Sequence, residues 1–178
     1  MATPPIFTAG AILTAAQMNV SGLWLIKSQV VGTAVSSVTV SDVFSADFDN
    51  YKIMYNGACS SAAQVVTMQL GATATGYYGN MIYADYGGVT GILRVNDNNA
   101  TSWTHLAGGA GSRVSLLVEL TNPFQSTMTH ISSPIYTDAT NAGSQRGFLN
   151  NTTSYTAFTL AIAGTITGGT ISVYGYRK

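Results

Sequence analysis

The sequence contains few charged side chains. Asp, Glu, Lys and Arg together make up 8% of its 178 residues, about a third of the usual share. Glu119 is the sole glutamate, and the chain has two histidines and one cysteine. Because acid/base catalysis and metal binding draw mainly on these residue types, we expect no catalytic site, no enzymatic activity and no cofactor. The composition favours a protein that acts through contact with other molecules.

Three further absences narrow the classes of function. The formal net charge is zero, so the chain has no basic field that would attract nucleic acid. Cys59 has no second cysteine with which to form a disulfide within the chain. No run of about 18 apolar residues could span a bilayer, and residues 1–16 lack the pattern of a signal peptide. We expect no nucleic-acid partner, no membrane insertion and synthesis in the cytosol.

Alternation of apolar and polar residues dominates the sequence from Leu23 onward. The alternating runs are Tyr51–Tyr55, Val66–Leu70, Tyr155–Ile162 and Gly169–Tyr176. This pattern places one face of a strand on a core and the other in solvent or against a partner. The runs are separated by residues typical of tight turns: Asn56-Gly57, Gly87-Gly88, Asp97-Asn98-Asn99, Gly108-Gly109, Asn122-Pro123, Asn141-Ala142-Gly143 and Gly168-Gly169. We predict one antiparallel β-sandwich domain, jelly-roll-like, over residues 23–178, with about eight to ten strands.

Residues 1–22 differ from the rest of the chain and form a predicted docking segment. Thr14 and Gln17 have the spacing of a capping box, in which each side chain bonds the other residue's backbone amide. The box predicts a short helical anchor from about Ala15 to Val20, too short to be stable alone in water. The segment is therefore expected to dock on the main domain or on another protein. The candidate docking residues are Ile12, Leu13, Thr14, Gln17 and Met18.

Three stretches of the sequence, Phe7–Asn19, Phe44–Ile53 and Gly169–Arg177, carry a resemblance to a known group. The first resembles the N-terminal segment of small minor tail and tail-fibre proteins in the virions of tailed bacteriophages. The second is similar to the turn and strand that precede the core in that group, and the third to its last strand. The resemblance implies a virion structural protein, commonly a homotrimer, whose N-terminal segment attaches to other virion proteins while the sandwich projects outward.

The predicted function is therefore a structural one in the virion. The chain is expected to be a short tail-fibre or spike-type protein that contacts the host surface, with a surface glycan as a candidate receptor. An alternative is a capsid decoration protein that clamps neighbouring capsomers. A less favoured alternative is a carbohydrate-binding or glycan-degrading module, since β-sandwiches often carry these activities. A glycan-degrading enzyme would normally need two carboxylates about 5 to 10 Å apart; the single Glu and six Asp residues make such a pair possible but do not support it.

Tyrosines gather in one glycine-rich stretch, Gly76–Gly88, which we interpret as a loop. Tyrosine offers a flat apolar face with a polar tip, which suits both subunit interfaces and receptor contact. Subunit contact or loop packing is the favoured interpretation, with receptor contact as the alternative. The candidate residues are Tyr77, Tyr78, Tyr83 and Tyr86.

Two other groups of residues have a structural and a functional interpretation. Oxygen-rich stretches containing Asp47 and Asp49, and Asp97 further along the chain, fit turns closed by their own side chains; calcium binding is the less favoured alternative. Trp103 and His105 are two residues apart and are expected on the same face of a strand, where a packed pair is favoured over a sugar-binding or general-base site.

Overall fold

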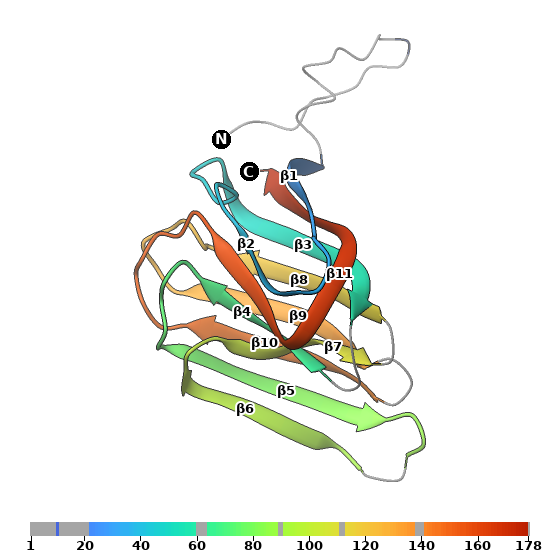
Figure 1. Ribbon diagram of the computed structural model, residues 1–178. Coiled ribbons are helices and arrows are strands. Elements are labelled where there is room, and N and C mark those ends of the chain that lie inside the picture. Colours follow the sequence, from blue (N-terminus) through green and yellow to red (C-terminus); the bar gives the residue numbers. More distant parts are fainter. Residues whose placement is uncertain are drawn as a thin grey trace.

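The computed structural model describes residues 10, 22–59, 64–88, 91–110, 113–137 and 141–177, and within them the chain is all-β, without a helix (Figure 1). The predicted N-terminal helix and its docking residues Ile12, Leu13, Thr14, Gln17 and Met18 lie outside the described residues. The strands are β1 (Leu23–Val30), β2 (Val35–Val40), β3 (Phe48–Cys59), β4 (Gln64–Leu70), β5 (Tyr77–Asp85), β6 (Leu93–Ala100), β7 (Trp103–Ala110), β8 (Arg113–Thr121), β9 (Thr129–Thr137), β10 (Asn141–Leu149) and β11 (Phe158–Arg177).

Alternation decides which side of each strand enters the core. In β3, Tyr51, Ile53 and Tyr55 are buried while the intervening Lys52 and Met54 face outward. The paired strand β8 repeats the pattern, with buried positions alternating with more exposed ones along its length. Because side chains of successive strand residues point to opposite faces, the inward sets of both strands meet in one core. The predicted antiparallel all-β class is confirmed, apart from a single parallel bridge between β7 and β9.

Strand β11 connects the parts of the sheet. It is 20 residues long, and its first half pairs with β2 and β4, whereas its second half pairs with β1 and β3. From β3 the pairing continues to β8, then from β8 to β7, and from β7 back to β4. This path returns to β11, so the sheet nearly closes into a barrel. These pairings do not by themselves establish the predicted jelly-roll sandwich.

A second path of pairing extends the sheet outward from β8. Strand β8 also pairs with β9, and β9, β10, β5 and β6 then follow in order (Figure 1). The strands β1-β11-β3-β8-β9-β10-β5-β6 therefore form one continuous sheet. One face of this sheet lies against the core, whose largest fully buried side chains include Trp103, Tyr51, Tyr55, Tyr77 and Phe158.

The turn predictions were right in some places and wrong in others. Asn122-Pro123 and Gly87-Gly88 lie between strands as predicted, but the other five glycine- and asparagine-rich stretches lie inside β3, β6, β7, β10 and β11. Gly57 and Gly169 show why glycine occurs within paired strands. A side chain on Gly169 would collide with the Asn56 carbonyl oxygen, and one on Gly57 with the Tyr55 phenol. These glycines allow close contact between β3 and β11 at a point where the register shifts.

Substitution of Gly169 by Ala should destabilise the fold more than the same substitution at Gly168. Both residues have positive φ, 77° and 65°, which costs a non-glycine residue about 1–2 kcal/mol. Only the added methyl group of Gly169→Ala would also meet backbone, at Asn56, because the space around Gly168 is open to 4 Å. Urea unfolding of both variants measures the difference. Equal losses of unfolding free energy would show that the close approach of β3 to β11 is unimportant.

Candidate functional site

One face of the continuous sheet is open and carries polar and aromatic side chains in register. The pairings align a single row of outward residues across the sheet, each directly opposite the next. The next inward residue on most of these strands is buried, so the row belongs to the face away from the core. The row consists of Tyr174, Lys52, Glu119, Ser132, Arg146, Asn80 and Asn96.

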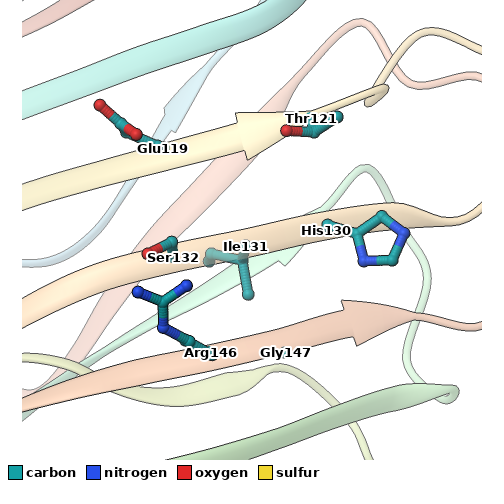
Figure 2. Close-up of a pocket in the computed structure, with 7 residues that line it drawn as sticks. All are labelled: Glu119, Thr121, His130, Ile131, Ser132, Arg146 and Gly147. Carbon is teal, nitrogen blue, oxygen red and sulfur yellow. The ribbon is translucent and has the colours of Figure 1, made fainter.

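Three shallow hollows lie side by side on this open face. The middle hollow, of about 320 Å³, crosses β8, β9 and β10 and is shown in Figure 2, where Glu119, Ser132 and Arg146 come from three neighbouring strands. A second hollow of about 320 Å³ lies toward β11 and shares Glu119 and Thr121 with the first. A third, of about 420 Å³, lies toward β6 and shares Arg146 and Gly147. We call these three connected hollows the cross-strand groove.

The β11 end of the groove is held by a hydrogen bond. The Tyr176 hydroxyl donates to Glu119 Oε1 over 2.7 Å, reaching past β3 from β11 to β8. The bond to this carboxylate raises the pKa of Tyr176 to about 12, because ionisation would place two negative charges in contact. The phenol therefore remains a donor at neutral pH, and the Glu119 carboxylate is fixed in orientation.

Three aromatic rings from β9, β10 and β5 stand side by side in the half of the groove toward β6. Phe148 is directly opposite His130 on one side and Tyr78 on the other. The Tyr78 and Phe148 rings stack with centroids 5.1 Å apart and an interplanar angle of 15°, and the His130 ring lies 6.4 Å from Phe148. Since His130 is exposed and the other two are half-buried, this aromatic row presents ring surface to solvent.

Glycines let the groove lie close over the core. Gly147, Gly79 and Asp97 are aligned on β10, β5 and β6. A side chain on Gly147 would meet the Tyr78 carbonyl oxygen and Trp103 Nε1, and one on Gly79 would meet Gln145 and Asp97. Two small residues here therefore allow two strands to pack directly over β7.

A buried polar network lies beneath these glycines. Asp97 Oδ1 accepts a hydrogen bond from Thr104 Oγ1 over 2.6 Å, and Asp97 Oδ2 accepts from the Thr104 amide and from Gln145 Nε2 over 3.0 and 3.1 Å. Asp97 lies within β6 rather than in the predicted turn. Its two oxygens therefore bind β7 and β10 to the sheet edge, which is a structural use of the carboxylate.

The Asp47 and Asp49 stretch also has protein partners. Asp47 Oδ2 accepts from Ser45 Oγ over 3.0 Å, and Asp49 Oδ1 accepts from Gln125 Nε2 over 2.9 Å. In the part of the chain that the structure describes, His, Cys, Asp and Glu residues form no group of three or more that could hold a metal ion.

The four candidate tyrosines do not form one loop. Gly76–Gly88 consists largely of β5, so the loop interpretation was wrong; pairing with β10 on one side and β6 on the other holds this strand extended. Tyr77 is fully buried, accepts a hydrogen bond from the Leu70 amide over 2.7 Å and meets Trp103 edge-on at 4.9 Å. Tyr78 lines the groove, Tyr83 lies on the opposite face, and Tyr86 is 61% exposed after the end of β5.

Trp103 and His105 are not a simple same-face pair. His105 has a positive φ of 60°, and the register with β4 shifts between Val66 and Met68 at this point, so strict alternation fails. Trp103 is fully buried, while the half-buried His105 ring bonds Thr104 Oγ1 over 2.7 Å. Burial lowers the pKa of His105, and the nearby Asp97 charge opposes this shift.

No family model matches the chain, and no curated protein sequence is similar to it.

Within the described ranges, no helix is long and apolar enough to cross a membrane.

Replacing Tyr77 by Phe should destabilise the protein without changing the surface. The substitution leaves the buried Leu70 amide without its acceptor, which costs about 1–3 kcal/mol. Tyr86→Phe is the control, because that hydroxyl stands on a side chain that is 61% exposed. Chemical denaturation compares the two; an unchanged unfolding free energy for Tyr77→Phe would contradict the assignment of Tyr77 to the core.

His105 should make stability depend on pH in mildly acidic solution. Its folded-state pKa lies below the ordinary 6.5, so the unfolded chain binds a proton first as the pH falls. The contribution of His105 to stability is therefore full above pH 6.5 and declines below it, until the folded protein also takes up the proton. Denaturation across this range should show the decline, and His105→Gln should flatten it. A steeper decline in that variant would refute the assignment.

Proposed function

We propose that the chain is a structural component of a tailed-phage virion, a homotrimeric short tail-fibre or spike-type protein anchored by its N-terminal segment and exposing its sheet for host-surface contact. The observation that carries the proposal is the surface of β1. This strand follows the docking segment directly and exposes three consecutive apolar side chains, Leu23 (46%), Trp24 (43%) and Leu25 (50%).

The position of β1 makes this exposure informative. Among the described strands it pairs with β11 alone, so no other described strand covers its second edge. An apolar edge strand left open is an aggregation hazard, and the exposed side chains of Leu23, Trp24 and Leu25 put apolar surface on both faces of this strand. If another virion protein or a neighbouring subunit covers β1, both the strand edge and the apolar side chains are shielded. The point of attachment is then adjacent in the chain to residues 1–22.

The low charge of the chain supports an assembly role over catalysis. Glu119 and Asp97 are the carboxylates that line the groove, and they lie on β8 and β6, four strand spacings apart. At ~4.8 Å per spacing this is about 19 Å, well beyond the separation of about 5 to 10 Å in glycoside hydrolases. Host-surface contact without cleavage is the function that this arrangement favours.

We further infer that the strands pack as a jelly-roll-like sandwich. The core cluster draws Val38, Val40, Met68 and Leu160 from β2, β4 and β11, and draws Ile53 and Val118 from β3 and β8. Figure 1 shows β2, β4 and the first half of β11 in front of β8 and β9, which supports two layers around one core.

Deletion of residues 1–22 should abolish incorporation into particles and leave the domain folded. The reason is that the predicted anchor is removed while the described strands from Leu23 onward are retained. Gold-labelled antibody against the intact protein, viewed by electron microscopy, should mark the tail of particles, and particles assembled with the truncated chain should carry no label.

Sedimentation of both purified chains is the control for this experiment. A trimer mass for each would show that the deletion removes attachment alone. Label on the head would favour the capsid decoration alternative, and normal incorporation of the truncated chain would refute the anchor. A stable monomer of the intact chain would refute the trimer.

A further inference from the structure

We propose that the cross-strand groove binds an extended oligosaccharide of the host-cell surface, lying across the strands from Tyr176 to Asn96. The inference rests on the proposed function for its biological setting, but the site itself is argued from the groove. The groove includes parts of the tyrosine stretch and of the Asp97 stretch singled out in the sequence, but neither stretch defines the site alone.

The first argument is shape. Adjacent hollows share lining residues at both junctions, Glu119 with Thr121 and Arg146 with Gly147. The lining residues come from β11, β3, β8, β9, β10, β5 and β6, so the groove crosses six strand spacings. At ~4.8 Å each, these give a length of about 29 Å. A groove that is long, shallow and open fits a linear chain of several sugar units better than a compact small molecule, which is usually enclosed.

The second argument is the kind of polar group along the groove. Asn50, Asn80 and Asn96 are exposed amides, each with donors and an acceptor on the same side chain. Sugar hydroxyl groups likewise both donate and accept, so amides can match them in either direction. Asn80 and Asn96 already bond each other over 2.7 Å, which fixes their orientation before a ligand arrives.

The charged groups of the groove add directional contacts. Tyr176 holds Glu119 through one carboxylate oxygen, which leaves the other oxygen as an acceptor on a residue that lines two of the hollows. Arg146 is exposed on the row between Ser132 and Asn80, and Figure 2 shows its guanidinium extending toward β9. One fixed acceptor and one multiple donor on opposite sides of the middle hollow can bind the hydroxyl groups on the two edges of a sugar ring.

The third argument is the aromatic row of His130, Phe148 and Tyr78. Aromatic rings present an apolar face that suits the C–H face of a sugar, and tyrosine adds a polar tip. The three rings lie on adjacent strands in register, beside the middle and β6-side hollows. The groove therefore offers a sugar chain polar side chains on one side and aromatic ring surface on the other.

Other occupants fit the groove less well. Nucleic acid would need an excess of basic groups to replace its counterions, whereas the groove holds Glu119 as well as Arg146. A second copy of the chain would bury both charged groups against a polar surface, and removing such charges from water is costly without close pairing. The exposed large apolar side chains of the described residues, among them Leu23, Met54 and Ile82, line none of the three hollows.

The test measures binding of the purified intact chain to an array of bacterial O-chain and capsular oligosaccharides of several repeat units. We expect binding to one or more members, with Arg146→Ala weakening it about tenfold or more, as loss of a central contact typically does. Asn96→Ala should weaken it in the same direction. Arg94→Ala is the matched control, because Arg94 is exposed on the same strand as Asn96, and on the same face, but lines none of the three hollows.

Unfolding free energies measured for each variant confirm that any loss comes from the site. No binding to any member of the array, or an equal loss with Arg94→Ala, overturns the inference, as does sedimentation showing that Arg146→Ala dissociates the oligomer. These outcomes are independent of the particle experiment. A chain that is present in the tail but binds no oligosaccharide refutes the groove alone, and a chain that binds through the groove but is absent from particles refutes the virion role alone.

Discussion

The rest of the structure depends on the pairing of β11 with four other strands. Its first half is hydrogen-bonded between β2 and β4, and its second half between β1 and β3. The last strand of the chain therefore joins the first four described strands, all of which lie within residues 23–70. Phe158, Leu160, Ile171 and Val173 on this strand are all buried, so the backbone connection and the apolar core are built from the same residues. Without β11, the near closure of the sheet and the position of β1 at its edge would both be lost.

Much of the strand content was predictable because alternation is a local signal. The runs Tyr51–Tyr55, Val66–Leu70 and Gly169–Tyr176 lie in β3, β4 and β11 as predicted. Strand β5 was interpreted as a loop, and the other missed strands, β6 and β10, are rich in Asn and Gly, which local propensity assigns to turns. They are extended because each pairs with β5 along nearly its whole length, and such long-range pairing leaves no trace in a short window of sequence.

The groove could not be predicted because its residues come from seven strands. Tyr176, Glu119, Arg146 and Asn96 are far apart in the chain and meet only through the register of the pairings. A period-two pattern does indicate that each of them faces outward, but strand order decides which outward residues become neighbours. The aromatic residues around Tyr78 were visible in the sequence. Phe148, on which the Tyr78 ring stacks, lies on β10, a strand that was interpreted in part as a turn.

The two-residue alternation of the sheet also separates two kinds of evolutionary change. Asn50 and Glu119 face the groove, and their chain neighbours Tyr51 and Leu120 are buried in the core. A substitution at an outward position alters the recognition surface and leaves the inward packing in place. Such a surface can acquire a new specificity by single steps, each of which is nearly neutral for folding. Comparable changes at the inward positions, which include the large aromatic residues of the core, would be eliminated because they destabilise the fold.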